Sequence, residues 1–182
     1  MEEAEQDVID VARMEGDAFV RVSGKGSFKN SPNLKSFCLS AAEDGAERII
    51  IDMGDCGGMD STFMGVISGL ARRLNSPGKK AIVMVNLEAE NHELLHTLGV
   101  TFLIETYNPS ESVEIIKAAA RECGDMDRLA DCDGRDRLTV ETMLNAHQEL
   151  CDVDESNLPR FENVIEYLET KISKLDDGTA AS

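Results

Sequence analysis

The chain has 182 residues, of which 42% are hydrophobic, so it can form one domain with an appendage or two small domains. Its 35 acidic residues outnumber 18 basic ones and give a formal net charge of −17, which argues against direct binding to nucleic acids or to anionic membrane surfaces. No apolar run approaches the roughly 20 residues that cross a bilayer, and residues 1–10 carry five acids and no basic residue, unlike a secretory signal. We therefore expect a soluble, cytoplasmic protein.

The cysteines and histidines do not suggest a metal site. The five cysteines are scattered, odd in number and free of any C-x-x-C pair, a usage typical of reduced structural thiols. The three histidines are few and dispersed, and we expect them at the surface. Because no convergent acid–base pair or phosphate-cradling loop is present either, we predict no cofactor, no metal and no enzymatic activity. These residues are Cys38, Cys56, Cys123, Cys132, Cys151, His92, His96 and His147.

The first part of the chain predicts a hairpin, a helix and a buried strand. Residues 7–14 contain several apolar side chains, and apolar residues recur at every second position over 17–22. With Glu15-Gly16 between the two segments, this pattern predicts two paired strands. Residues 31–45 have apolar side chains at helical spacing. Residues 48–53 form a continuous β-branched run, which is typical of a central strand that is buried on both faces.

Helices and strands then alternate up to residue 122. The predicted elements are a loop over 55–59, helices over 61–74, 90–98 and 109–122, and strands over 81–85 and 100–104. Together with the first part, this order predicts one α/β domain over residues 1–122, with a mixed sheet and helices packed mainly on one of its faces.

The last third of the chain has a different character. Residues 123–137 are rich in Asp, Arg and Gly and are predicted to form an acidic linker, whereas 138–175 have the apolar pattern of a helical hairpin that Thr139 caps. Residues 176–182 are predicted to be a flexible tail. The apolar stripe of the hairpin must be buried, either on its own domain or against a partner, so a homo-oligomer that forms through these helices is one possibility.

The most informative segment follows the buried strand. It reads Ile49-Ile50-Ile51-Asp52-Met53-Gly54, a short loop, and then Met59-Asp60-Ser61-Thr62-Phe63-Met64-Gly65-Val66. This pattern resembles the STAS domains of anti-sigma factor antagonists, in which a hydrophobic strand and loop lead to Asp-Ser-Ser/Thr-Gly-hydrophobic-Gly at the start of a helix. The resemblance covers about residues 7–122, including the order of the elements and the later Leu98-Gly99-Val100, and it implies a STAS-like fold with the helical hairpin as an extension.

The resemblance implies a function in partner switching. In that family, the serine that matches Ser61 is phosphorylated by a serine kinase that is also an anti-sigma factor, and the phosphorylated form releases its partner; a phosphatase would reverse the reaction. Thr62 is a weaker candidate for modification. The implied partner-binding residues are Asp60, Ser61, Thr62, Met64, Gly65 and Ser68. The alternative is a constitutive scaffold in a larger signalling assembly, in which Ser61 only begins a helix.

The physical chemistry of this segment fits a switch. Asp60 can cap the helix, which leaves Ser61 in its first turn, where a phosphate of about −1.5 to −2 charges is tolerated by the positive end of the helix. Phe63 replaces the usual glycine of the family, and it either points outward and restricts the kinase or points inward as core, which its helical phase favours. Gly65 and Gly69 lie on one side of the helix with Ser68, and this shallow surface packs either on a partner helix or on the domain's own sheet.

Overall fold

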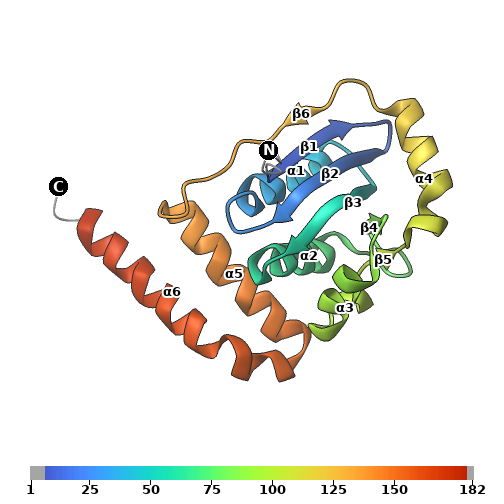
Figure 1. The fold of residues 1–182 in the computed structure, drawn as a ribbon. Helices are drawn as coiled ribbons and strands as arrows, with labels where there is room; N and C mark the ends of the chain where they lie inside the picture. Colours follow the sequence, from blue (N-terminus) through green and yellow to red (C-terminus); the bar gives the residue numbers. More distant parts are fainter. Residues whose placement is uncertain (1–6, 180–182) are drawn as a thin grey trace, which may run out of the picture.

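The computed structural model describes residues 7–179 (Figure 1). Six strands form one mixed sheet in the order β5-β4-β3-β2-β1-β6. Strands β2 to β5 run parallel to one another, whereas β1 is antiparallel to both of its neighbours. The strands are β1 (Val8–Arg13), β2 (Asp17–Gly26), β3 (Arg48–Met59), β4 (Ile82–Val85), β5 (Glu105–Thr106) and β6 (Asp127–Arg128). The helices are α1 (Ser31–Glu43), α2 (Ser61–Leu74), α3 (Ala89–Thr97), α4 (Pro109–Glu122), α5 (Arg137–Val153) and α6 (Leu158–Thr179).

Strand β3 lies at the centre of the sheet, as its β-branched run predicts. Ile49 and Ile51 face one side and Ile50 faces the other, and all three are buried. The strand continues to Met59, so the predicted loop over 55–59 is wrong. The reason lies in β2, which pairs with β3 up to Gly26↔Met59 through two irregularities that local sequence patterns do not encode.

The helices cover the two faces of the sheet unequally. Helices α1, α2 and α3 pack with one set of alternating strand residues into the larger core, where each fully buried aliphatic side chain contributes about 1.5–3 kcal/mol. Helix α4 covers the opposite face, where Ile115 and Ile116 contact a smaller cluster that includes Phe19 and Ile50. The predicted fold class is confirmed: a mixed sheet with helices mainly on one face.

The strand predicted over 100–104 is wrong. Gly99 has a φ of +77°, which turns the chain after α3, and Val100–Phe102 form a short 3₁₀ helix. Val100 and Ile104 still fill the core from this turn, so the apolar run reflects burial rather than an extended backbone. The next strand along the chain, β5, has only two residues.

The acidic segment before the hairpin lies along the edge of the sheet. Strand β6 pairs with β1, and the Arg128 guanidinium forms an ion pair with Asp10 at 2.9 Å. Further on, the Cys132 N–H donates to the Lys29 carbonyl. The segment predicted as a linker thus contacts the sheet domain and brings the chain to the start of α5.

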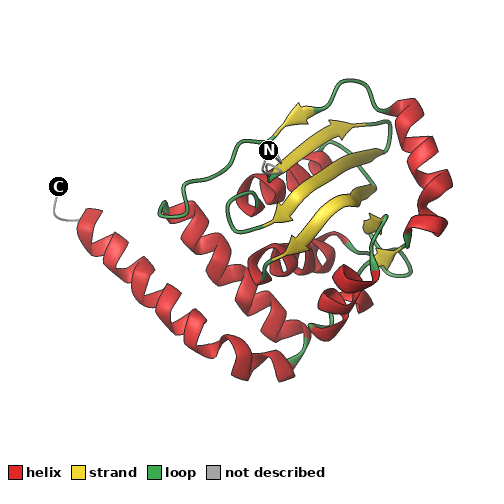
Figure 2. Cartoon of the chain, in the orientation of Figure 1, coloured by secondary structure: helices red, strands yellow, loops and turns green. Residues whose placement is uncertain are grey.

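Helix α5 packs across α2, and α6 packs on α5 (Figures 1 and 2). Asp136 rather than the predicted Thr139 caps α5, because the Thr139 N–H donates to the Asp136 carboxylate. Helix α6 continues to Thr179, into the segment predicted as a tail, and the rest of that segment lies outside the described residues. None of the helices in the described part of the chain is long and apolar enough to cross a membrane.

Candidate functional site

Asp60 fixes the start of α2, as predicted. One oxygen of its carboxylate accepts a hydrogen bond of 2.9 Å from the Phe63 N–H, which is the expected cap. The other oxygen accepts a bond of 2.8 Å from the Phe28 N–H in the loop after β2. Because Asp60 ties the helix start to a second loop, the position of Ser61, the first residue of the helix, is well defined.

Ser61 is half-buried, and its hydroxyl contacts a histidine of the C-terminal hairpin. The Ser61 Oγ lies 2.9 Å from Nε2 of His147 in α5. The His147 Nδ1 lies 2.7 Å from the Met143 carbonyl, which can only accept, so Nδ1 carries the proton. Nε2 of the neutral ring therefore accepts the hydrogen bond from the Ser61 hydroxyl.

His147 was expected at the surface, and this prediction is wrong: the residue is 3% exposed, and its ring packs on Phe161 of α6. Its burial could have been inferred from the helical phase that it shares with the apolar Val140, Met143 and Leu150. The contact with Ser61 could not, since 86 positions separate the two residues.

The buried histidine should make the contact sensitive to pH. Burial lowers the pKa of His147 below its usual value, because the charged ring is poorly solvated there, although the Met143 carbonyl and Asp60 act in the opposite direction. The unfolded chain therefore binds a proton more readily than the folded chain. The stabilisation is complete above the unfolded pKa and is lost as the pH falls through it towards the folded pKa.

We expect the wild-type protein to lose more stability than a His147→Gln variant when the pH falls from about 7.5 to about 5.5. Urea unfolding at the two pH values measures the difference. An equal loss in both proteins would show that His147 does not control the pH response.

The other residues of α2 that were predicted to bind a partner are largely closed off within the chain. Thr62, Met64 and Ser68 are buried, and Gly65 contacts the backbone of Ala146. A Cβ atom at Gly65 would lie 2.6 Å from the Ala146 carbonyl carbon, so only glycine permits this approach. The surface expected to meet either a partner helix or the sheet thus meets a helix of the same chain.

Phe63 points inward and belongs to the core. Its side chain is fully buried, and its ring lies so close to Gly26 in β2 that a Cβ there would be 2.7 Å from the ring. The aromatic ring in place of the family glycine therefore fills space beneath the helix and does not obstruct the surface around Ser61.

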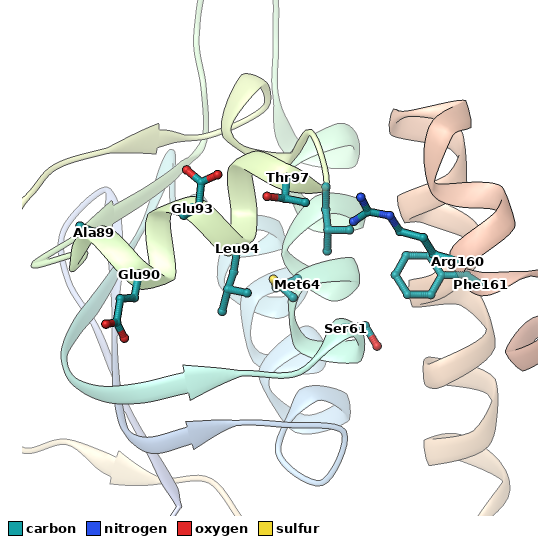
Figure 3. A pocket seen from close by; sticks show the side chains of 10 residues that line it. Ser61, Met64, Ala89, Glu90, Glu93, Leu94, Thr97, Arg160 and Phe161 are labelled. Carbon is teal, nitrogen blue, oxygen red and sulfur yellow. The ribbon is translucent and has the colours of Figure 1, made fainter.

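A groove of about 820 Å³ opens beside Ser61 (Figure 3). It lies between the start of α2, helix α3 and the start of α6, and Figure 3 shows Arg160 and Phe161 on the side opposite Leu94. Its lining is mainly apolar, with three charged residues. The lining comprises Ser61, Met64, Ala89, Glu90, Glu93, Leu94, Thr97, Leu98, Arg160 and Phe161. Nowhere in residues 7–179 are three His, Cys, Asp or Glu side chains grouped so that they could hold a metal ion.

The family model of the STAS domain matches residues 8–113, more than half of the chain. The chain belongs to the STAS domain family. The match contains the whole segment from β1 through β3 and α2 to the start of α4, and it ends before the acidic segment and the hairpin. A search of the curated proteins finds no match.

Solved structures with this fold include anti-sigma factor antagonists. TM1081 of Thermotoga maritima, assigned to that class, has a TM-score of 0.50 and 16% identity, and the match covers 60% of this chain and 94% of TM1081. SpoIIAA of Bacillus, an anti-sigma factor antagonist solved in unphosphorylated and phosphorylated forms, has 17% and 18% identity and TM-scores of 0.47 and 0.44. These matches cover 63% and 62% of this chain and 97% and 99% of SpoIIAA. At such identities the likeness to TM1081 shows the shared fold.

Proposed function

We propose that this STAS domain is a protein-binding module of the anti-sigma factor antagonist type, and that phosphorylation of Ser61 controls its contacts. The position of Ser61 carries the proposal: it begins α2 directly after the Asp60 cap, and it lies at the rim of an open apolar groove. The hydroxyl is thus at the boundary between the fold and the surface that a visiting protein would contact.

A phosphate at Ser61 would change the interface more than the fold. It adds about −1.5 to −2 charges at a helix N-terminus, where an anion is tolerated. A docked partner would instead face a dianion beside Asp60. Like charges that are desolvated at an interface cost several kcal/mol, on the order of 10²-fold in affinity.

The partners that we propose are a serine kinase that is also an anti-sigma factor and a phosphatase, acting in the cytoplasm in a partner-switching pathway. The strongly acidic composition supports a protein partner over a nucleic acid. Thr62 is the less suitable phosphate acceptor, because it is buried.

Incubation with the cognate kinase and ATP is expected to place one phosphate on Ser61, mapped by mass spectrometry, and Ser61→Ala should abolish it. Ser36→Ala, a change at an exposed serine of α1, serves as the matched control and should leave the phosphate in place. In pull-downs from native extract, Ser61→Asp should lose partners that the wild type retains. A phosphate that maps elsewhere and is unaffected by Ser61→Ala would exclude the switch.

A constitutive scaffold is the second candidate, and the cover that α5 forms over α2 favours it. In that role, the Ser61–His147 hydrogen bond would simply join the hairpin to the domain. A large homo-oligomer in size-exclusion chromatography that does not respond to Ser61→Asp would support the scaffold against the switch.

A further inference from the structure

We infer that the hairpin α5–α6 is an internal competitor for the surface through which α2 binds other proteins. This inference rests on the proposed function, because it takes that surface to be a docking site. We call the surface the α2 face and define it by residues that share one side of the helix through spacings of three or four positions, namely Ser61, Gly65, Ser68, Gly69 and Arg72.

The α2 face is shaped to receive a helix, and α5 shows which features that helix needs. Gly65 lets the two backbones touch at Ala146, where a side chain on α2 would separate them. Ala146 is itself only 2% exposed, so a larger side chain there has little room. One turn further on, Gly69 lies beneath Glu149. The Arg72 guanidinium then binds Glu149 and Asp152, so acidic residues follow the small residue on the bound helix. A fitting partner is therefore an amphipathic helix with a small residue at the crossing and acidic residues one to two turns later.

The fit between α5 and the α2 face is incomplete at one point. Ser68 is fully buried, and within residues 7–179 its hydroxyl has no hydrogen-bond partner. An unsatisfied buried hydroxyl weakens an interface, and a competing helix with a polar residue at this position could satisfy it. The face is thus not specialised for α5 alone.

The Ser61–His147 hydrogen bond couples the hairpin to the modification site. The His147 ring occupies the space next to the Ser61 hydroxyl, 2.9 Å away, and the contact between Gly65 and Ala146 one turn later prevents a small shift of α5. A phosphoserine also lacks the hydroxyl that donates to Nε2, so this hydrogen bond is lost. Because the His147 ring occupies space that a phosphate on Ser61 would need, phosphorylation would weaken the attachment of α5 to α2.

The closed hairpin would lower the apparent affinity of α2 for an external partner. While α5 is in place, a partner can bind only the fraction of molecules in which the hairpin has opened, and its apparent affinity is reduced by that fraction. Changes that open the hairpin without touching α2 should therefore raise the affinity for any helix that binds the α2 face.

A labelled peptide with the sequence of residues 136–153 is a direct probe of this competition. It should bind an Ala146→Leu variant of the full chain at least about tenfold more tightly than it binds the wild type, because overpacking at the crossing opens the internal α5. Asn145→Leu, a change of similar character at the exposed neighbouring position, should behave as the wild type does. Fluorescence anisotropy gives the affinities.

Hydrogen–deuterium exchange on the same proteins reports where the chain opens. In Ala146→Leu, the amides of α5 and α6 should exchange at least about tenfold faster, while the protection of β1 to β4 stays unchanged. Leu150→Ala, which removes a fully buried contact of α5, should give the same result without overpacking.

Three outcomes would overturn the inference: unchanged exchange in both variants, loss of protection in the sheet as well as in the hairpin, or an opened hairpin that does not let the peptide bind. The first two would show that α5 belongs to the cooperative core, and the third that the α2 face is not a docking surface. None of them depends on the kinase. Failure to phosphorylate Ser61 would therefore remove the proposed switch while leaving this result to stand or fall separately.

Discussion

A Phe63→Ala variant is expected to lose about 3–5 kcal/mol of its free energy of unfolding, the usual range for removing a buried phenyl ring. The Phe63 ring is fully buried between α2 and the sheet, and it lies directly on Gly26. Since no side chain at Gly26 can expand into the space, the cavity would remain largely unfilled. Urea denaturation followed by circular dichroism measures the loss.

Phe102→Ala is the matched control for this prediction. Phe102 is 72% exposed at the end of the 3₁₀ helix, so its removal should change the stability by about 0.5 kcal/mol or less. A loss below about 1 kcal/mol in Phe63→Ala would mean that the site collapses readily or that the ring is not packed as described. In the second case, Phe63 would have to be reconsidered as a residue of the partner surface.

The parts of the fold that could be predicted from the sequence are those that neighbouring residues determine. The run Ile49-Ile50-Ile51 predicts a buried central strand because its side chains are apolar on both faces. Asp60 predicts the start of α2 because the cap bond to Phe63 spans only three residues. The inward direction of Phe63 follows from its helical phase in the same way.

The errors occur where contacts between distant residues decide the structure. The apolar run after α3 is buried like a strand, but the turn at Gly99 makes it a 3₁₀ helix. Strand β3 continues beyond its apolar run because it pairs with β2. In both cases the local pattern reports burial correctly and leaves the backbone conformation to tertiary contacts.

Only one of the two sides of the candidate site could be predicted from the sequence. The side that α2 contributes follows from the motif, whereas the side that α5 contributes depends on how the C-terminal hairpin packs. The sequence shows that the hairpin must bury an apolar stripe, yet a helix of the same domain and a separate partner satisfy that requirement equally well. His147 was therefore missed as a contact of Ser61.

A Gly65→Ala variant is expected to lose about 1–3 kcal/mol of stability, even though alanine favours helix formation over glycine by up to about 1 kcal/mol. The added Cβ would lie 2.8 Å from the Ala146 Cα and 2.6 Å from its carbonyl carbon, and a helix backbone cannot move aside locally. We expect α5 to be pushed away from α2, with faster exchange of its amides and a lower urea midpoint.

Gly69→Ala, one turn later on the same helix, separates this steric effect from helix propensity. There the added Cβ would lie 3.2 Å from Cγ of Glu149, which belongs to a flexible and partly exposed side chain that can turn away. Because the helix also gains propensity, Gly69→Ala should change the stability by less than about 1 kcal/mol. Equal losses of stability in the two variants would indicate that both substitutions act within α2 and not through its contact with α5. A loss confined to Gly65→Ala would show that the backbone contact with Ala146 fixes α5 in place, since it is the only one of the two contacts that cannot relax.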